Sequence, residues 1–470
     1  MANSYLSKNF GSAGNKKTMT FSFWVKRGTV TADGDFFIGD AQTGYPSHFI
    51  LFQSDDKLSI RSQAGVSGET LRFTTLRKFI DTTAWYHIVI AIDTTQASAG
   101  DRCKVWVNGV QETAFSTSDQ TNGFGQNSDT YFNNGSSDEY IGKYASDYAR
   151  FTLAHYHFVD GTAYTPSTFG ETDSTSGIWK PKTNPSVTYG THGFFLKFQN
   201  SGALGTDSSG NSKTWTVNGN LKQSISTPSN KFPNLNPRGT ATGYGTAVYT
   251  LDSGTTALMT TGVNRVAPID MCFQGGKWYW ECKIEKANNS STLGVYMTDF
   301  SSPKRIEQFN ADLALQSAAN GGKRAVSFLT SASSSQIQNA GSTVTYGANC
   351  SDGDIIMFAF DSATGKVWTG RNGTWNNAPS TSNVGNPAAG TNDSGTVLTN
   401  TDNDLMSFYI SGRASDSTNR YMYINFGHGY FGTTAVASAN ADGNGKGSFE
   451  YAPPTGFLAL CSSNIQSDGG

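Results

Sequence analysis

Four acidic side chains could supply the chemistry of glycoside hydrolysis. Glu171 and Asp173 lie in the run ETDSTS, and Glu281 and Glu285 lie on one face of the expected strand ECKIE. A retaining hydrolase needs two carboxyl groups about 5 Å apart, one as nucleophile and the other as general acid. ETDSTS has Ser176 where a further acid would be needed, in a stretch with the composition of a loop. We therefore expect no catalytic residues and a protein that is not an enzyme.

Metal-ligating residue types are present but sparse. His155 and His157 alternate in AHYHF, so they could share a strand face and ligate a metal. No third ligand stands nearby, and a pair of half-exposed strand residues is the simpler interpretation. The run GTDSSGNS, residues 205–212, lacks the acidic density of a calcium loop and favours an Asx turn.

One group of side chains suits the binding of a sugar. Arg371, Asn372, Trp375 and Asn376 surround an Asn-Gly pair in GRNGTWNN. An aromatic ring offers an apolar face, and amide and guanidinium groups supply hydrogen-bond donors beside it. We select these four residues as the ligand-binding site, while a hairpin tip packed on its neighbour remains the alternative. The other tryptophans in strand patterns should be core residues: Trp24, Trp85, Trp106, Trp278, Trp280 and Trp368.

The elements around these residues are strands joined by tight turns. Alternating runs such as MTFSFWVKRG and AWYHIVIAID recur along the chain, with Gly, Asn, Asp and Ser between them. Asn-Gly interrupts three runs that contain a tryptophan, at residues 108–109, 218–219 and 372–373. This pair supplies the two positive φ angles of a type I′ turn, so each run predicts a hairpin. The chain should be all-β.

The composition narrows the class of protein further. Only 15% of the 470 residues are charged, the formal net charge is -2, and no block of Lys or Arg occurs, so a nucleic-acid surface is not expected. The first residues lack the apolar core of a signal peptide, and no run has the roughly twenty apolar residues of a membrane span. The five cysteines are widely spaced, which predicts free thiols rather than a disulfide or zinc scaffold.

The length predicts two domains. Residues 226–240 hold three prolines among polar residues, and the strand pattern resumes after them. We therefore expect a sandwich over residues 1–225, a proline-rich linker over 226–240 and a second sandwich over 241–470.

The first half resembles laminin-G-like and pentraxin-like members of the concanavalin-type sandwiches. The resemblance runs from residue 18 to 163 and is carried by FSFWVKRG, AWYHIVIAID, CKVWVNGVQ, YIGKY and FTLAHYHFVDG. No cofactor is expected, although such domains often carry Ca²⁺ at one edge, so the resemblance implies a possible Ca²⁺ site in the first domain. Asp40, Asp93, Asp160 or Asn108 could contribute ligands.

The second half resembles a SPRY domain, which is also a concanavalin-like sandwich. The resemblance runs from about Gly275 to Leu460 and is carried by GKWYWECKI, LGVYM, DGDIIMFAFDSATGKVWTGRNGTW, YINFG and APPTGFLAL. Glu281 falls on a framework position of that pattern, which argues against a catalytic role. The sequence thus predicts two tandem concanavalin-like jelly rolls.

The whole chain is similar to surface proteins of tailed bacteriophages. The phrases SYLSKNFGSAGNKKTMTFSFWVKRG and HGFFLKFQNSGALGTDSSGNSKTWTVNGNLKQSISTPSNKFPNLNP carry this resemblance. It implies a virion-surface location after synthesis in the host cytoplasm, other virion proteins as partners and a possible homotrimer. A tail fibre or capsid fibre that adheres to bacterial surface polysaccharide is expected. A purely structural decoration protein and a polysaccharide-depolymerising tailspike are the alternatives.

Overall fold

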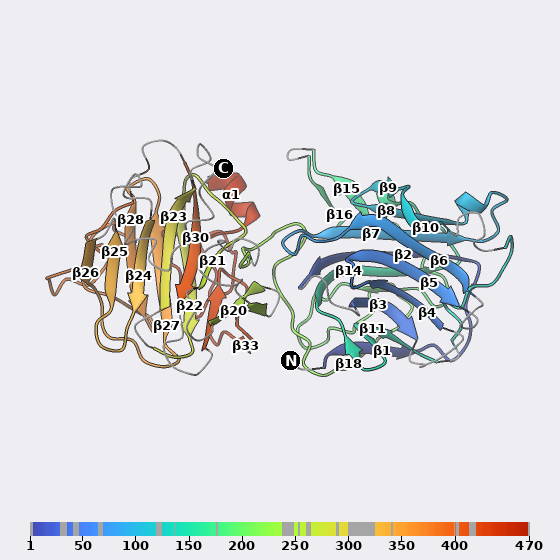
Figure 1. The fold of residues 1–470 in the computed structure, drawn as a ribbon, viewed down its shortest axis with the longest axis horizontal. Coiled ribbons are helices and arrows are strands. Elements are labelled where there is room, and N and C mark those ends of the chain that lie inside the picture. The colour runs from blue at the N-terminus through green and yellow to red at the C-terminus, as the bar shows by residue number, and fades with distance from the viewer. Residues whose placement is uncertain are drawn as a thin grey trace. The chain divides into compact units, whose positions relative to one another are not determined.

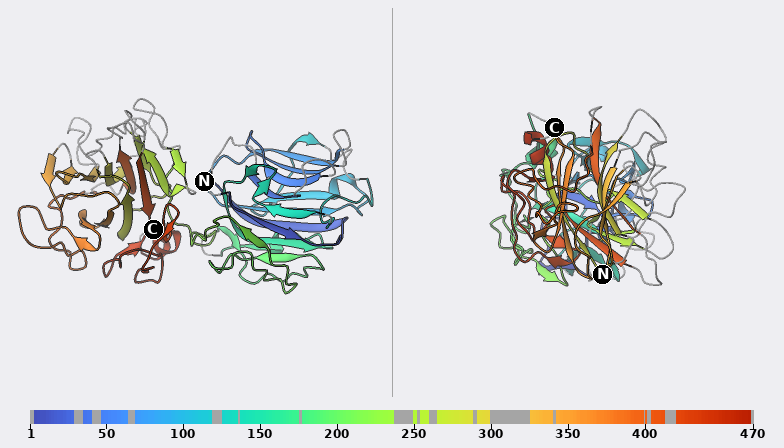
Figure 2. Two further views of the ribbon diagram at one scale, coloured as in Figure 1. Left: turned by 90° about the horizontal axis from the view of Figure 1, so that it is seen from below. Right: turned by 90° about the vertical axis from the view of Figure 1, so that its left-hand side faces the viewer.

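The fold was analysed in a computed structural model. It describes residues 3–28, 35–40, 47–63, 69–118, 125–135, 137–174, 177–236, 249–251, 254–259, 265–287, 291–298, 325–339, 342–398, 400, 404–412 and 420–468. The chain divides into two compact units, residues 1–223 and 224–470. Within each unit two large sheets pack face to face, as Figures 1 and 2 show, so the chain is all-β and consists of two β-sandwiches.

The first unit combines an eight-stranded and a six-stranded antiparallel sheet. The larger sheet has the order β10 (Phe115–Ser118), β6 (Glu69–Lys78), β5 (Lys57–Gln63), β4 (Ser47–Phe52), β3 (Asp35–Asp40), β11 (Asp138–Ile141), β1 (Tyr5–Asn9) and β18 (Thr216–Asn218). The smaller sheet has the order β17 (Phe194–Leu196), β14 (Phe151–Asp160), β2 (Thr18–Arg27), β7 (Tyr86–Asp93), β8 (Cys103–Val107) and β9 (Val110–Glu112).

Both faces of β2 are buried in this unit. Phe21, Phe23 and Val25 enter the core between the sheets, as their alternation predicts. On the opposite face Trp24 is only 3% exposed and stacks on the imidazole of His87, with ring centroids 4.7 Å apart. The smaller sheet therefore does not present this face as an open polar surface.

The segment after β14 covers part of that second face. It includes the short hairpin of β15 (Gly170–Thr172) and β16 (Trp179–Pro181). The indole Nε1 of Trp179 donates a 2.9 Å hydrogen bond to His87 Nδ1, and His87 Nε2 lies 2.9 Å from Ser22 Oγ. Because Nδ1 accepts, the proton of the neutral imidazole lies on Nε2 and is donated to Ser22. Burial lowers the pKa of His87 to about 3, so the imidazole holding this hairpin is neutral.

The second unit repeats the arrangement of two sheets. One sheet has the order β19 (Tyr249–Leu251), β20 (Thr256–Met259), β31 (Arg420–Asn425), β22 (Lys277–Ile284), β27 (Ile355–Asp361), β28 (Lys366–Arg371) and β29 (Thr374–Trp375), with β34 (Leu458–Ala459) parallel to β22. The other has the order β21 (Arg265–Pro268), β30 (Leu405–Gly412), β23 (Ser291–Thr298), β24 (Ala325–Thr330), β25 (Gln336–Asn339) and β26 (Ser342–Thr345). The short helix α1 (Ser462–Asp468) follows β34. Among the described residues, no helix has the length and apolar character needed to cross a membrane.

The start of the second unit includes part of the expected linker. We placed that linker over residues 226–240, whereas the second compact unit begins at Ser224. Phe232 and Leu235 are buried in the cores of this unit, and the backbone N–H of Asn234 donates to Asp270 Oδ1 over 2.9 Å. Residues 226–236 therefore pack as part of the second sandwich, and residues 237–240 lie outside the described residues.

Asn-Gly turns close one hairpin in each sandwich. Asn108 and Gly109, with φ of 50° and 81°, join β8 to β9, and Asn372 and Gly373, with φ of 48° and 85°, join β28 to β29. Each asparagine also pairs with the adjacent strand: Oδ1 accepts from the backbone N–H of His87 or Ile355, at 2.8 and 2.9 Å. In addition, the backbone N–H of Asn108 donates to the carbonyl oxygen of His87, and that of Asn372 donates to the carbonyl oxygen of Ile355. The amide thus extends the ladder by one pair beyond the last strand residue, which gives the repeated motif a structural role.

The third Asn-Gly pair corrects a prediction. KTWTVNGNLKQ was expected to form a hairpin, but its strand β18 pairs with β1 at the edge of the larger sheet. Gly219 has a φ of 74°, and a Cβ there would lie 2.3 Å from the carbonyl oxygen of Asn3. Close packing against the start of the chain therefore replaces the local turn.

The thiol prediction is confirmed, because all five cysteines are free. Four of them are buried, and Cys272 is exposed.

Candidate functional site

A hollow of about 610 Å³ lies beside the hairpin of β28 and β29. The four residues selected from the sequence, Arg371, Asn372, Trp375 and Asn376, all line it. The remaining wall comes from Thr374 and from two segments, residues 345–348 at the end of β26 and residues 377–381 after β29. The structure thus brings the selected residues to one place, although each has a different role there.

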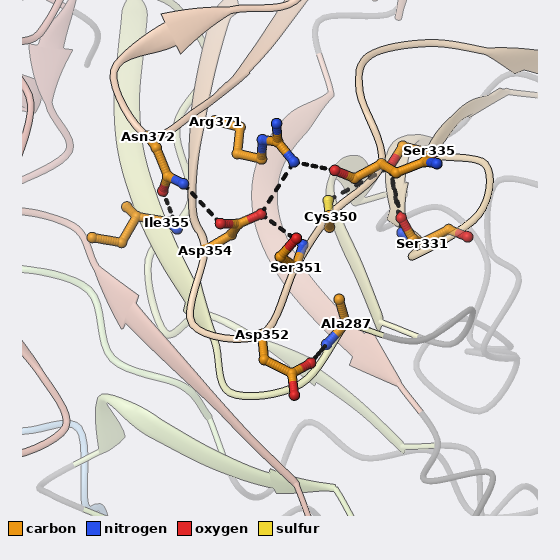
Figure 3. A network of polar contacts seen from close by, with 11 residues as sticks. Ala287, Ser331, Ser335, Cys350, Ser351, Asp352, Asp354, Ile355, Arg371 and Asn372 are labelled. Carbon is orange, nitrogen blue, oxygen red and sulfur yellow. Dashed lines mark hydrogen bonds and ion pairs between the residues drawn. The ribbon is translucent and has the colours of Figure 1, made fainter.

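Asn372 belongs to the turn rather than to the free surface of the hollow. Besides accepting from Ile355, its Nδ2 donates a 2.7 Å hydrogen bond to Asp354 Oδ1. Figure 3 shows both contacts, which occupy the two ends of the amide. Asn372 therefore shapes the rim of the hollow.

Arg371 is the cation of the hollow. Its Nη1 donates to the carbonyl oxygen of Asn349 and lies 3.4 Å from Asp354 Oδ2. The other carboxylate oxygen, Asp354 Oδ1, accepts a hydrogen bond from Asn372 Nδ2. Asp354 Oδ2 also accepts one from the backbone N–H of Ser351 over 2.7 Å. The Arg371 side chain is 33% exposed and that of Asp354 only 10%. The guanidinium is therefore held at one nitrogen and accessible at its other side.

Trp375 does not provide an open platform. In the hairpin register Gly370 faces Trp375, and Arg371 faces Thr374. Opposed residues share a face and successive residues alternate, so Trp375 and Arg371 point to opposite faces of the hairpin. Trp375 is half-buried and packs edge-on against Tyr279, with ring centroids 6.3 Å apart. Trp375 therefore fits the alternative interpretation, in which the hairpin tip packs on its neighbour.

Asn376 is buried and supports the wall between the hairpin and residues 345–348. Its Nδ2 donates to Thr369 Oγ1 over 2.8 Å, and its backbone N–H donates to the carbonyl oxygen of Thr369. Gly347 lies against it with a φ of 85°, and a Cβ there would be 2.4 Å from Asn376 Nδ2. Only glycine combines this backbone conformation with so close an approach.

Sequence reasoning missed the residues that carry most of the exposed polar surface here. Asn377, Ser380 and Thr381 are exposed and line the hollow. The signal was available in NNAPST, a polar run that follows β29 directly. The stretch 378–404 is rich in Gly, Asn, Ser and Thr, which predicts a long exposed loop, yet Leu398 is fully buried and Trp368 Nε1 donates to the carbonyl oxygen of Thr391 over 2.9 Å.

The acidic residues considered for hydrolysis are engaged in two different settings. Glu171 and Asp173 belong to the first unit, where Lys180 Nζ lies 4.0 and 2.6 Å from their carboxylates and neutralises them as an ion pair, and Glu281 and Glu285 belong to the second unit. The last two share a strand face, but four residues of extended chain place their backbones roughly 13 Å apart. Their carboxyl groups also have separate partners: that of Glu281 accepts from Tyr279 and Asn425, and that of Glu285 from the backbone N–H of Tyr421.

Glu281 is instead a buried framework residue. Its carboxyl group accepts from the Tyr279 hydroxyl at 2.9 Å, Asn425 Nδ2 at 3.1 Å and the backbone N–H groups of Glu450 and Tyr451 at 3.0 and 2.8 Å. Burial raises the pKa of Glu281 to about 7, against the opposing effect of these hydrogen bonds. The raised pKa of Glu281 therefore results from its full burial and does not indicate an accessible site.

The paired histidines both lie beside the ring of Phe195, with the centroids of His155 and His157 5.9 and 3.8 Å from it. A bulge interrupts the pairing of β14 with β2 between Ala154 and His157, and His155 has a φ of 48°. His157 is buried against Phe195, with ring centroids 3.8 Å apart, and its Nδ1 lies 2.8 Å from the Tyr189 hydroxyl. His157 is thus engaged by Phe195 and Tyr189 within the packed interior.

The residues considered for Ca²⁺ are engaged at separate places. Asp160 Oδ1 accepts from the backbone N–H of Asn15, and Asp93 Oδ1 accepts from that of Thr95. Asp40 is buried near His48, at 3.8 Å, and Asn108 forms the turn described above. In the part of the chain that the structure describes, no cluster of His, Cys, Asp or Glu is arranged to hold a metal ion.

The Asx turn predicted in residues 205–212 is confirmed. Asp207 Oδ1 accepts from the backbone N–H of Ser209 over 2.8 Å, and Oδ2 accepts from that of Lys213 over 2.7 Å.

Comparison with known families supports the laminin-G-like assignment of the first sandwich. Residues 2–161 match the family described as the concanavalin A-like lectin/glucanases superfamily, Laminin_G_3. This match covers less than half of the chain. No curated protein sequence matches the chain significantly.

Solved structures similar to this chain include SPRY domains. The TRIM65 PSpry domain is 12% identical, with 41% of this chain and 92% of that chain covered and a TM-score of 0.27. The SPRY domain of human HERC1 is 16% identical, with coverages of 40% and 96% and a TM-score of 0.26. Stonustoxin is 10% identical, with coverages of 41% and 28% and a TM-score of 0.26.

Proposed function

We propose that the protein is a non-enzymatic surface component of a tailed-bacteriophage virion that adheres to polysaccharide on the bacterial host. It would act as a tail fibre or as a capsid fibre or decoration, bound to other virion proteins. The phage-like phrases at the start and middle of the sequence support the location. Many copies on one particle would add weak single contacts into firm attachment.

The hollow beside β28 and β29 is the observation that carries the adhesion proposal. Its exposed rim consists of amide and hydroxyl side chains, Asn377, Ser380 and Thr381, next to the accessible guanidinium of Arg371. Sugars present many hydroxyl groups that both donate and accept hydrogen bonds, so such a rim can meet them along several edges. The volume of about 610 Å³ lies within the range of small-molecule sites.

A retention assay with the full chain tests this proposal. The chain is incubated with a panel of bacterial surface polysaccharides, with and without Ca²⁺, and polymer retention and polymer length are both recorded. Asn377→Trp places a bulky ring at the hollow. Ser382→Trp adds the same ring at an exposed position of the same loop that does not line the hollow, and so serves as the matched control.

We expect polymer of unchanged length to be retained by the wild type and by Ser382→Trp, and released by Asn377→Trp. Absence of retention across the panel would contradict adhesion and favour a purely structural decoration protein. Shortened polymer would contradict the non-enzymatic proposal and favour a tailspike. In that case Glu171, Asp173, Glu281 and Glu285 would be the first residues to replace.

A further inference from the structure

The hollow beside β28 and β29 has an uneven distribution of charge. Arg371 lines it, and none of the described residues that line it is acidic. Asp354 pairs with Arg371 from outside this lining, and its side chain is only 10% exposed. A ligand in the hollow therefore meets a positive charge without an adjacent exposed negative one.

Asp354 satisfies only part of the hydrogen-bonding capacity of Arg371. Its two oxygens already accept from Asn372 Nδ2 and the Ser351 N–H, both at 2.7 Å, while the guanidinium lies farther away at 3.4 Å. Of the three guanidinium nitrogens of Arg371, only Nη1 has hydrogen-bond partners among the described residues. Figure 3 shows the other nitrogens of this side chain directed away from Asp354.

Free guanidinium donors have a preferred ligand. The Nε and Nη2 nitrogens form one edge of the planar fork, which matches the two oxygens of a carboxylate. Neutral sugar hydroxyls would leave the positive charge of Arg371 without a counter-charge in the hollow.

We propose that the hollow recognises an acidic sugar, a uronic acid or other carboxylated residue of a polysaccharide, with its carboxylate bound by Arg371. This inference rests on the proposed function, because it names the class of glycan that the same hollow would take. Asn377, Ser380 and Thr381 would meet the hydroxyl groups of that sugar, since they form the exposed polar rim.

The test compares one polymer in two chemical forms. A uronic-acid polysaccharide is assayed before and after its carboxyl groups are reduced to primary alcohols, which leaves the backbone unchanged. Binding to the full chain is measured by calorimetry at low and high salt. A charge-assisted pair of this kind corresponds to about ten- to a hundredfold in affinity, so the acidic form should bind tighter by that factor. High salt should weaken the acidic form only.

Three variants test whether Arg371 causes the preference for the acidic form of the polymer. Arg371→Met should remove the preference for the acidic form, and Arg371→Lys, which keeps the charge but not the fork, should retain part of it. Lys104→Met removes one exposed cation from the first unit and should leave the preference unchanged. Thermal unfolding of each variant checks that the sandwich remains folded, and the salt dependence of the wild type tests the charge without any substitution.

Each other outcome has a distinct meaning. Equal binding of the acidic and reduced forms would overturn the acidic-sugar inference and leave glycan adhesion standing. Binding of neither form, nor of any polymer in the panel, would overturn both. A preference that survives in folded Arg371→Met would place the carboxylate elsewhere, and equal or tighter binding of a sulfated polymer would overturn carboxylate recognition in favour of general polyanion binding.

Discussion

The imidazole of His87 should make the first sandwich sensitive to acid. It is held neutral between Trp179 Nε1 and Ser22 Oγ, stacked on Trp24, and burial lowers its pKa from the ordinary 6.5 to about 3. Between these two pH values the unfolded chain binds a proton at this position and the folded chain does not. The stability contributed by His87 is therefore present above pH 6.5 and is progressively lost as the pH falls toward 3.

The size of this effect follows from the two pKa values. At pH 5 the unfolded histidine lies 1.5 pH units below its pKa of 6.5, while the folded one is still almost fully neutral. The proton bound by the unfolded state then lowers the free energy of unfolding by about 2 kcal/mol relative to pH 7. Replacement by His87→Asn removes the titration, keeps an acceptor for Trp179, and should cost about 1–3 kcal/mol at pH 7 through lost packing and hydrogen bonding.

Urea unfolding of both proteins at pH 7 and pH 5 measures the difference. The other titrating groups, including Asp35 and Asp40 with pKa values raised to about 6 by burial, are common to both proteins and cancel in this comparison. The wild type should lose about 2 kcal/mol more than His87→Asn on acidification. Trp179→Phe, which retains the histidine, should keep the acid-dependent loss. Equal losses in the wild type and His87→Asn would refute the claim that His87 is buried and neutral.

Three further predictions concern turns, thiols and the hollow. Asn108→Ala or Asn372→Ala should lower the free energy of unfolding by about 1–2 kcal/mol, because alanine disfavours positive φ and lacks the amide; substitution by glycine should cost less, and equal costs would contradict the conformational argument. Only Cys272 should react rapidly with a thiol reagent in the native protein, and the four buried cysteines only after denaturation; early modification of a second thiol would argue against this packing. Gly347→Ala should destabilise the second sandwich by about 1–3 kcal/mol and reduce glycan retention, since its Cβ would meet Asn376; unchanged unfolding and retention would argue against this close contact.

The local pattern predicted the strands and two of the Asn-Gly turns because their causes are local. Alternation identifies the inward face of β2, and positive φ at Asn and Gly specifies a two-residue hairpin. Asn218 shows where such reasoning fails: its strand β18 pairs with β1, which is distant in sequence, and that contact outweighs the turn preference. The burial of Trp24 was predicted and is confirmed, but its stacking partner His87 lies on another strand and could not be identified from the local pattern.

The candidate site could be predicted only in part for the same reason. Arg371, Asn372, Trp375 and Asn376 are close in sequence, so their gathering at one hollow follows from the hairpin. The opposite wall comes from the separate segment 345–348, and no local pattern joins it to the hairpin. The orientation of Trp375 depends on strand register, which composition and residue type do not specify.

The Asn372-Gly373 turn also has a consequence for chemical ageing. Asn-Gly is prone to deamidation, in which the glycine nitrogen attacks the asparagine side-chain carbon and ammonia leaves. This attack requires the side chain of Asn372 to rotate toward the glycine nitrogen. The rotation must break the hydrogen bonds of Asn372 with Ile355 and Asp354, so the folded turn protects the amide. Once deamidated, residue 372 would carry a carboxylate in place of the group that donates to Asp354 over 2.7 Å. Two negative charges would then face each other beside Arg371, so the age of the protein would be recorded in the chemistry of this rim.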